Sequence, residues 1–548
     1  MPFLAKEHML LSNKDILSWM LDDISYDIDK PIYIDAVNGE RTISARQAVA
    51  IIRRLAAGFK ALGLKSGDCV CIHAFNDIYY SMLFLGIVAA GGIFAGTNPS
   101  HTPHELSHAI ETAKIKYLVV EPSLIPNVAT AAQKCNIPVT NIFLFNLHNE
   151  DITAHLAAGF RSWKWLQSHG SCDWLRFDDY KTSTTTTAAR LFSSGTTGLP
   201  KALELTHYNL VAQHTLTMDY RPRAYEVRRL ICNPMFHVSQ VPRGHTSPLK
   251  GGYVTYVLRR FSLSPWLKVI EEGKLTEISF VPTMLLNLLT DPTARNRKNA
   301  FRGLRNTWSG SAPLDKEPQR RFKELFLPEQ TPFNQVWGMS ETSGIATMLY
   351  PPEQDVSGSV GRAVPNVDLK IVGEDGEDIS DYGVRGELCI RGPIVVKGYF
   401  GNEEAGRRDW DEDGYFHTGD VAYCDGETGL WYIVDRKKEL IKVRGFQVAP
   451  AEIEGVLVSH PHVVGCAVVG VAMAKEESSE LPRAYVVLRP GATVKEAELA
   501  EFAARRLARY KRLEGGVKFV ESIPQNASGK ALKNELREIA KRELGSKL

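Results

Sequence analysis

The sequence predicts an α/β fold: a large N-terminal domain of parallel-sheet α/β subdomains with a small β subdomain, then a small, mobile α+β C-terminal domain. Three observations predict it. Helical and strand-like segments alternate over the first 180 residues, which is typical of parallel sheets. Between 369 and 399 the chain becomes β-rich, and beyond Arg436 its composition changes again. Because 548 residues exceed what one hydrophobic core normally supports, we expect two domains, 1–435 and 436–548.

Along the N-terminal part, stretches with the hydrophobic spacing of helices alternate with stretches typical of strands. Apolar residues recur at helical spacing up to Leu62, and Gly63 is placed to end that helix. A run of threonines at 181–187 has low complexity, and we expect it to form a mobile surface segment. The expected elements here are helices at 45–62 and 79–90, strands at 69–74, 116–120 and 188–192, and a helix from Pro122.

The last third has two further patterns. Short β-like segments at 369–399 are separated by Gly-Glu-Asp-Gly and Arg-Gly-Pro turns, which indicates a small β subdomain. After Arg436 a charged hairpin-like stretch precedes a compact α+β domain. Its expected elements are helices at 451–458 and 497–507 and strands at 463–471 and 484–488.

The composition is that of an ordinary globular enzyme, with 44% apolar and 23% charged residues. The 65 basic and 63 acidic side chains nearly cancel, so bulk charge favours neither nucleic acid nor an anionic membrane. The longest apolar stretch, 82–95, is too short to span a bilayer. The eight cysteines form no Cys-x-x-Cys pair, so we expect reduced structural thiols and no zinc site.

The chain ends in Ser546-Lys547-Leu548, the tripeptide that the peroxisomal import receptor reads. It follows a charged helical stretch at 532–544, which should leave the tail exposed. We therefore expect a peroxisomal protein with this receptor as a partner.

A loop rich in glycine and hydroxyl side chains runs from Ser193 to Lys201. Its glycines permit backbone shapes that turn amide groups toward a phosphate, and its hydroxyls and lysine add donors and charge. The Walker pattern is excluded because Gly195 and Gly198 are only three residues apart and Ala202 follows the lysine. An ordinary surface loop of turn-forming residues is the alternative. The loop reads Ser193-Ser194-Gly195-Thr196-Thr197-Gly198-Leu199-Pro200-Lys201.

This ordered string resembles the phosphate loop of the adenylate-forming superfamily, which includes acyl-CoA synthetases, coumarate–CoA ligases, beetle luciferases and peptide-synthetase adenylation domains. The chain is most similar to peroxisomal coumarate–CoA-ligase-like acid–CoA ligases. Further motifs of the superfamily recur in the expected order, and the resemblance extends from about residue 30 to 540. They lie at 233–237, 309–314, 335–342, 415–420, 435–442, 445–452 and 524–530.

The resemblance implies an enzyme that uses ATP, Mg²⁺ and coenzyme A. A small-molecule carboxylic acid attacks the α-phosphate of ATP to give acyl-AMP and pyrophosphate, and the CoA thiol then displaces AMP. The protein would act by positioning and charge stabilisation. The implied ATP/AMP contacts are Ser193, Ser194, Gly195, Thr196, Thr197, Gly198, Lys201, Ser311, Ala312, Pro313, Gln335, Val336, Trp337, Gly338, Ser340, Asp420, Arg436 and Lys530.

Particular roles follow from the same resemblance. Glu341 would bind Mg²⁺, because this ion prefers carboxylate oxygen. Asp420 and Arg436 would hold the ribose, and Trp337 would stack on adenine where relatives have tyrosine. Lys530 would reach the substrate carboxylate and the α-phosphate. Taken singly, these residues also suit a helix cap, a turn, a core aromatic and a solvated charge.

The thioester half-reaction implies a second group of residues. Lys438 matches the hinge, whose backbone absorbs a rotation of the C-terminal domain. The implied CoA contacts are Lys442, Gly445, Phe446 and Gln447. The implied catalytic side chains are Lys530, Lys442, His237 and Glu341.

The implied acyl pocket is formed by His237, Ser239, Ser311, Val336 and Gly338. Val336 stands where many relatives have glycine, which should narrow the pocket, and Ser239, Gln240 and Arg243 make its wall polar. We therefore expect a small, aromatic or functionalised acid. His237 could instead be a buried core histidine.

Three other functions share part of this pattern. A carrier-protein-loading adenylation enzyme would have the same loop, but no carrier domain follows Lys530. A luciferase-like oxygenase also ends in Ser-Lys-Leu, but no residue indicates oxidation. A non-enzymatic nucleotide- or acyl-binding protein is disfavoured because Lys201, Glu341, Asp420 and Lys530 are all present.

Overall fold

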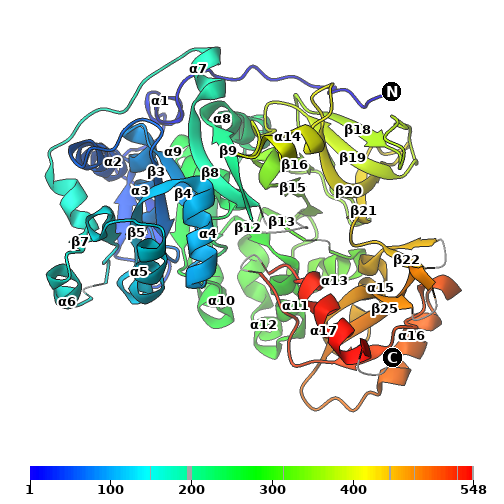
Figure 1. The fold of residues 1–548 in the computed structure, drawn as a ribbon. Helices are drawn as coiled ribbons and strands as arrows, with labels where there is room; N and C mark the ends of the chain where they lie inside the picture. The colour runs from blue at the N-terminus through cyan, green and yellow to red at the C-terminus, as the bar shows by residue number, and fades with distance from the viewer. Residues whose placement is uncertain are drawn as a thin grey trace.

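The structure is a computed structural model of the chain that describes residues 1–148, 150–193, 200–312, 314–443, 446–473, 476–526 and 529–545. Two sheets with their helices and a smaller β region form the N-terminal part, drawn from blue to yellow in Figure 1. The C-terminal elements, orange to red, lie beside it as a separate group. The predicted α/β class and the two-part architecture are confirmed.

The first sheet has seven strands in the order β7-β6-β5-β3-β4-β8-β9, parallel except for the β8–β9 hairpin. Its central strand is buried on both faces: Cys69 and Cys71 join one core cluster, while Val70 and Ile72 join another. The elements are β3 (Cys69–His73), β4 (Ile93–Gly96), β5 (Ile115–Val120), β6 (Ile142–Leu144), β7 (Arg161–Ser162), β8 (Thr187–Ser193), β9 (Lys201–Thr206), α2 (Ala45–Ala61), α3 (Tyr80–Ala89), α4 (Pro103–Ala113), η1 (Pro122–Leu124), α5 (Ile125–Lys134), η2 (Val139–Asn141), α6 (Thr153–Ala157), η3 (Trp163–Ser168) and α7 (Tyr180–Thr185).

Local signals position the first long helix as predicted. Ser44 and Gln47 form a capping box at the start of α2, and Gly63 follows its end with a φ of +87°. Residues 180–185, which include most of the threonine run, form the helix α7, which the sequence did not predict. Asp179 caps its first turn by accepting from the Thr182 amide, and the Thr184 hydroxyl donates to the Tyr180 carbonyl at 2.8 Å. Hydroxyls bonded to the preceding turn suit these threonines to a short helix.

The second sheet also has seven strands, in the order β14-β13-β12-β10-β11-β1-β2, parallel except at the β1–β2 edge. Its elements are β1 (Pro31–Asp35), β2 (Thr42–Ser44), β10 (Arg228–Ile231), β11 (Val254–Val257), β12 (Glu277–Phe280), β13 (Asn306–Ser309), β14 (Phe333–Gln335), α1 (Ile16–Leu21), α8 (His207–His214), η4 (Thr215–Asp219), η5 (Val238–Gln240), η6 (Val241–Thr246), α9 (Ser247–Gly251), α10 (Leu263–Glu272), α11 (Pro282–Thr290), α12 (Pro292–Asn296), η7 (Lys298–Gly303) and α13 (Lys316–Phe326).

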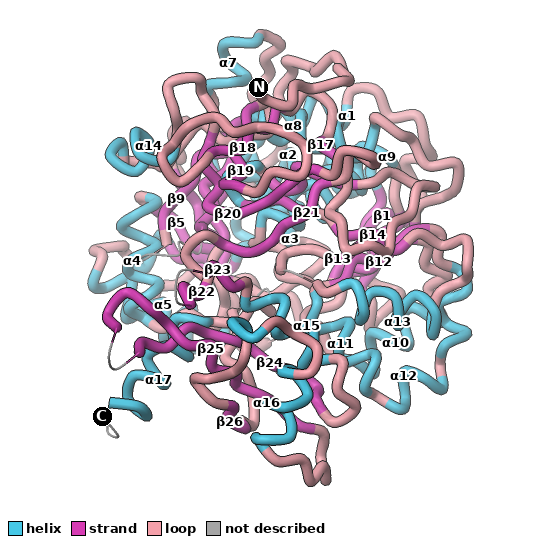
Figure 2. Tube along the Cα trace, turned by 90° about the vertical axis from the view of Figure 1, so that its right-hand side faces the viewer, coloured by secondary structure: helices cyan, strands magenta, loops and turns pink. Residues whose placement is uncertain are grey.

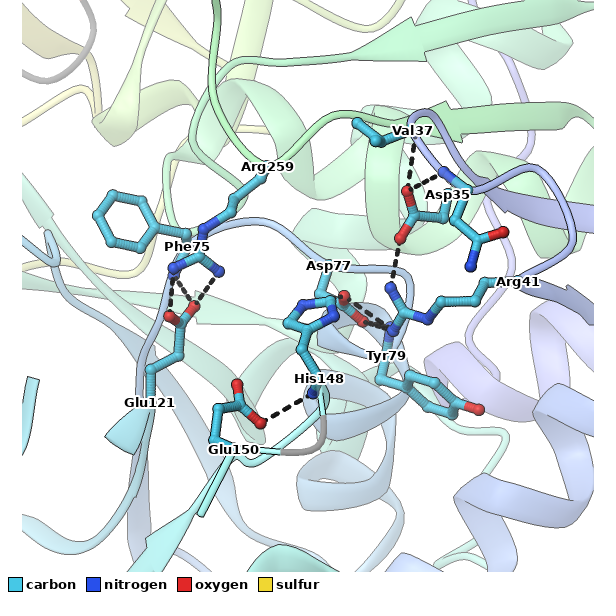
Figure 3. Close-up of polar contacts among 11 residues, drawn as sticks. Asp35, Val37, Arg41, Phe75, Asp77, Tyr79, Glu121, His148, Glu150 and Arg259 are labelled. Carbon is cyan, nitrogen blue, oxygen red and sulfur yellow. Dashed lines mark hydrogen bonds and ion pairs between the residues drawn. The ribbon is translucent and has the colours of Figure 1, made fainter. Parts of the chain in front are cut away.

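Ion pairs tie the two sheets together at the ends of their strands (Figure 3). Arg259, which follows β11, donates to both carboxylate oxygens of Glu121, which follows β5. Arg41, just before β2, lies between Asp35 of its own sheet and the buried Asp77 of the other. Because these bidentate contacts join segments far apart in sequence, they fix how the two sheets meet.

The β subdomain packs against both sheets. A sheet β15-β16-β17 and a four-stranded antiparallel sheet β18-β19-β20-β21 share one core cluster, as the β-rich composition predicts. The elements are β15 (Trp337–Met339), η8 (Ser340–Thr342), β16 (Gly344–Met348), β17 (Arg362–Ala363), β18 (Asp368–Val372), β19 (Gly386–Arg391), α14 (Glu403–Asp409), β20 (Phe416–Cys424) and β21 (Trp431–Arg436).

The C-terminal elements build their own core around β24 and β25, and Figure 2 shows them grouped at the bottom of the molecule. The core clusters change between Ile433 and Ile441, on either side of the expected boundary at 435/436. The elements are β22 (Ile441–Val443), β23 (Phe446–Val448), α15 (Pro450–Val458), β24 (Val463–Met473), β25 (Glu476–Leu488), α16 (Glu496–Ala504), η9 (Arg509–Lys511), β26 (Val517–Phe519) and α17 (Lys533–Gly545).

All eight cysteines are free thiols. Among the described residues, no helix is both long and apolar enough to cross a bilayer. Over the same residues, no cluster of three or more His, Cys, Asp or Glu side chains is arranged to hold a metal ion.

Candidate functional site

A cavity of about 740 Å³ lies where the two large sheets, the β subdomain and the C-terminal domain meet. The parallel strands β4, β10, β12 and β13 end at it, with Thr97, Asn233, Phe280 and Gly310 in its wall. Binding outside the carboxyl ends of parallel strands is typical of open α/β sheets. Lys530 and Asn526 reach the same cavity from the C-terminal domain.

Ser193 and Lys201, at the two ends of the predicted phosphate loop, line this cavity. Ser193 ends β8 and Lys201 begins β9, and the two residues face each other in the antiparallel ladder. The Lys201 ammonium lies 3.5 Å from the Asp409 carboxylate and 4.3 Å from the centre of the Tyr399 ring. The predicted contacts Ser194, Gly195, Thr196, Thr197 and Gly198 lie outside the described residues.

Glu341 places a buried carboxyl group in the wall, in the short helix η8. The Tyr399 hydroxyl donates to its Oε1 at 3.5 Å, and the Val396 amide donates to its backbone carbonyl at 2.8 Å. Burial raises the pKa of Glu341, and Arg436 and Lys201 oppose that shift. A cation beside this carboxylate would therefore be stabilised.

Asp420 lies just behind the wall, after Thr418 and Gly419, which line the cavity. The Trp337 indole Nε1 donates to its Oδ2 at 2.7 Å, and Arg436 Nε lies 3.3 Å from its Oδ1. Trp337 is buried in the core and is not part of the cavity wall. The structure thus shows a bond that the sequence did not reveal, from the tryptophan expected on adenine to the aspartate expected on ribose.

In the segment around β14 and β15, some predicted residues are buried in the core and others line the cavity. Gln335 turns inward, where its amide donates to the Leu314 carbonyl and to Gln319 Oε1, both at 2.9 Å. A Cβ on Gly338 would lie 1.8 Å from the Gly344 carbonyl, so only glycine fits there. The predicted residues of this region in the wall are Ser311, Val336, Gly338 and Ser340; Ala312 is not in it, and Pro313 lies outside the described residues.

Lys530 sits in a tight turn held by Asn526, whose side chain accepts from the Lys530 amide and whose own amide donates to the Lys530 carbonyl, both at 2.9 Å. Gly529 approaches α11 so closely that a Cβ would lie 2.7 Å from the Thr283 hydroxyl oxygen. Burial and then the charge of Arg436 lower the pKa of Lys530. This turn therefore holds a lysine of the C-terminal domain inside a cavity built mainly by the N-terminal domain.

The predicted acyl residues His237, Ser239, Ser311, Val336 and Gly338 all line the cavity. His237 caps η5, its Nδ1 accepting from the Ser239 amide at 3.2 Å. Burial lowers the pKa of His237 to about 4, so its ring is neutral at physiological pH. Val336 packs against Gly310, where a Cβ would meet Val336 Cγ2 at 2.8 Å. Phe236, Phe280 and Trp308 also line the cavity, and the sequence did not mark them.

The predicted hinge and CoA residues are placed differently. Lys438 is in the cavity wall, in the turn between β21 and β22. Lys442, Phe446 and Gln447 lie on the β22–β23 hairpin and are exposed and not in the wall, while Gly445 is outside the described residues. Phe446 stacks on Tyr510 at 4.4 Å between ring centres. The structure therefore places Lys201, Glu341 and Lys530, which were predicted for adenylation, on one cavity, and the described residues predicted for CoA lie outside its wall.

Taken together, the cavity presents the cations Lys201, Arg436 and Lys530 beside the single buried carboxyl of Glu341. Fixed positive charges in a shielded site stabilise phosphate charge as it develops. The end near the neutral His237 combines aromatic side chains with the polar Ser239, Gln240 and Arg243. This arrangement suits a polyphosphate at one end and a small organic group at the other.

Comparisons with known proteins match nearly the whole chain. The family model described as AMP-binding enzyme matches residues 25–400, and the one described as AMP-binding enzyme C-terminal domain matches 452–530. The chain is 49% identical over 525 residues to a phenylacetyl-CoA ligase of Aspergillus niger, covering 96% of each chain. It is 35% identical to a nicotinic acid-CoA ligase of Penicillium canescens, covering 93% of this chain and 94% of the relative.

Solved structures give the same picture. ATP-bound MatB from Rhodopseudomonas palustris has a TM-score of 0.83 and 29% identity, covering 97% of this chain and 99% of its own. The anthranilate CoA ligase AuaEII in complex with anthranoyl-AMP shares the fold with a TM-score of 0.85 at 22% identity, covering 98% and 99%.

Proposed function

The chain belongs to the family of AMP-binding enzymes and is an AMP-forming acid–CoA ligase, and we propose that its cavity activates a small, aromatic or functionalised acid. The reaction joins a carboxylic acid to CoA while ATP is cleaved to AMP and pyrophosphate. One observation carries the proposed mechanism: Lys530 from the C-terminal domain shares a cavity with Lys201 and Glu341 from the N-terminal domain.

In the proposed first step a carboxylate oxygen of the acid bonds to the α-phosphorus of ATP, and the bond to the pyrophosphate oxygen breaks. Two anions must approach each other, so the protein's task is to offset their repulsion. The ammonium of Lys530, beside Arg436, would serve that approach. Lys201 would hold the β- and γ-phosphates with the loop that follows Ser193.

In the proposed second step the CoA thiolate attacks the acyl carbonyl carbon, and AMP leaves with the electrons of the broken acyl–phosphate bond. The residues assigned to CoA lie on the exposed β22–β23 hairpin. We propose that a rotation at Lys438 brings Lys442, Gly445, Phe446 and Gln447 to the cavity. Domain rotations about a few backbone torsions are a common way to separate two half-reactions.

Magnesium fits the residues present. The Glu341 carboxyl is buried and lines the cavity, and the Tyr399 hydroxyl reaches its Oε1 only at 3.5 Å, so a hard cation in the cavity would find a carboxylate oxygen there. One or two carboxylates plus substrate phosphates are the usual magnesium ligands. When bound, the ion would neutralise phosphate charge. Glu341 would hold it in place.

Cavity shape and the relatives support the proposed acid class. The cavity wall contains Val336 packed against Gly310, together with Phe236, Trp308 and the neutral His237. The A. niger relative is a phenylacetyl-CoA ligase and the P. canescens relative a nicotinic acid-CoA ligase. We propose phenylacetate-sized acids as substrates and exclude long-chain fatty acids.

We also propose import into peroxisomes through Ser546-Lys547-Leu548, which lie outside the described residues beyond α17. The support is the sequence of the tripeptide and its place after a charged helix. A fluorescent fusion that keeps this tail should become punctate, and removing the three residues should make it diffuse. Diffuse fluorescence with the tail intact would contradict the proposal.

The function is tested by pyrophosphate release with a panel of acids, with and without CoA. We expect phenylacetate-sized acids to give pyrophosphate, sustained turnover only with CoA, and acyl-CoA as the product. Highest turnover on palmitate would contradict the acid class. Transfer to a carrier protein in preference to CoA, or emission of light with oxygen, would favour the other adenylating functions.

A further inference from the structure

Arg243 is a buried cation in the wall of the acyl pocket. It belongs to the π-helical turn η6, which follows His237 and Ser239, and only 5% of its surface is exposed. Single-turn π-helices often occur at functional sites, because the extra residue re-aims a side chain. The turn here brings Pro242 and Arg243 to the same wall as Gln240.

Its guanidinium has no hydrogen-bond partner among the residues that the structure describes. Nη2 is fully shielded from solvent and unpaired. Its neighbour is the Trp308 ring, 5.0 Å from Cζ, which contributes a cation–π contact but accepts no directed hydrogen bond. Buried guanidinium groups are normally paired, because an unpaired buried charge is strongly destabilising.

The nearby carboxylate is already engaged. Glu277 accepts from Arg223 Nε at 3.0 Å, from Arg229 Nη2 at 2.9 Å and from the Tyr225 hydroxyl at 3.0 Å. Three buried guanidinium groups therefore surround one carboxylate. Burial and the charge of Arg229 lower the pKa of Arg243 to about 9, and the charge of Glu277 opposes this shift.

Among these arginines, only Arg243 belongs to the cavity wall, so a ligand in the cavity is the partner that can approach its guanidinium group. A carboxylate suits a guanidinium because two oxygens match two parallel N–H donors. Ser239 and Gln240, beside it in the wall, add short polar side chains. The activated carboxyl group of the acid must lie at the other end, near Lys530.

We propose that Arg243 binds a second carboxylate, carried by the acid at the end away from the carboxyl group that is activated. The physiological acid is thus a small dicarboxylic acid, and the enzyme produces its mono-CoA thioester. The inference rests on the proposed ligase function and names its substrate class. Arg243 is a specificity residue that contacts substrate, and it takes no part in the chemical steps.

The test compares matched pairs of acids: phenylacetate with 4-carboxyphenylacetate, and hexanoate with hexanedioate. Pyrophosphate release in the presence of CoA gives kcat/KM for each. We expect the dicarboxylic member to be preferred in at least one pair by roughly 10-fold or more, since hydrogen bonds to charged groups discriminate by about 10- to 150-fold.

Arg243→Gln should abolish this preference by raising KM for the dicarboxylic acid, so that the ratio of kcat/KM between the two members of each pair falls to about one, and Arg243→Lys should keep part of the preference. Arg228→Gln is the matched control: Arg228 also lies over an aromatic ring, Tyr256, but is not in the wall, so the ratio should not change. The wild-type panel needs no variant to fold.

Two outcomes would overturn the proposal. One is a wild-type enzyme that prefers the monocarboxylic member of both pairs, and the other is a dicarboxylic preference that Arg243→Gln leaves intact. If the enzyme is active, either result contradicts only the proposal that Arg243 binds a second carboxylate. No pyrophosphate release with any acid would instead contradict the ligase function itself.

Discussion

Replacing Trp337 by phenylalanine removes the 2.7 Å bond from its indole N–H to Asp420 while keeping an aromatic ring in the core. Hydrogen bonds to charged groups contribute about 1.5–3 kcal/mol, and both partners here are buried. The smaller ring adds a packing loss of about 1 kcal/mol. We therefore expect the free energy of unfolding to fall by roughly 2.5–4 kcal/mol in total.

Urea unfolding of the full chain without ATP measures this loss, and a double-mutant cycle isolates the bond. Trp337→Phe and Asp420→Asn, alone and together, should show a coupling energy of about 1.5–3 kcal/mol. Trp165→Phe serves as a control, because the Trp165 ring packs near Phe143 and His169 in the first sheet's region, far along the chain from Asp420. A coupling energy near zero would show that the indole does not hold the aspartate.

Two further predictions concern pH and acid size. As pH rises, the rate of acyl-AMP formation should fall because Lys530 must be protonated; since the pKa of Lys530 is lowered, this loss should begin at a lower pH than for a solvent-exposed lysine. As pH drops, the rate should also fall because Glu341 must be ionised; since the pKa of Glu341 is raised, this loss should begin at a higher pH than for an ordinary glutamate. A pre-steady-state rate of acyl-AMP formation that stays constant across the whole pH range would contradict both assignments. Val336→Gly, which removes the side chain packed against Gly310, should improve kcat/KM for naphthylacetate relative to phenylacetate by about 10-fold, since a methylene-sized change in a pocket is worth roughly 1–3 kcal/mol. An unchanged ratio would show that Val336 does not limit the pocket.

Local signals in the sequence predicted much of the fold. The helix α2 was predicted from its apolar spacing and from Gly63, and the structure adds the capping box of Ser44 and Gln47 at its start. The threonine run at 181–187 was predicted as a mobile surface segment from its low complexity, and the helix that Asp179 caps at residues 180–185 was not foreseen. Composition alone does not show such hydrogen bonds.

The site residues that belong to recognisable sequence motifs could be predicted, but the contacts between residues far apart in the chain could not. Lys201, Glu341 and Lys530 stand in recognisable strings, and the structure places all three on one cavity. The bond from Trp337 to Asp420 joins residues 83 positions apart. The shortage of carboxylates around Arg243 likewise depends on which chain segments pack together, and a local sequence pattern does not show this packing.

The measurement that tests the central account most directly separates the two half-reactions in Lys530→Ala. Acyl-AMP formation from acid and ATP should fall by about 100-fold or more, since removing one preorganised electrostatic contact typically costs that much. Thioester formation from supplied acyl-AMP and CoA should stay within a few-fold of wild type, while Lys442→Ala should show the opposite pattern. Equal losses in both half-reactions for Lys530→Ala would contradict the account that Lys530 serves the adenylation step.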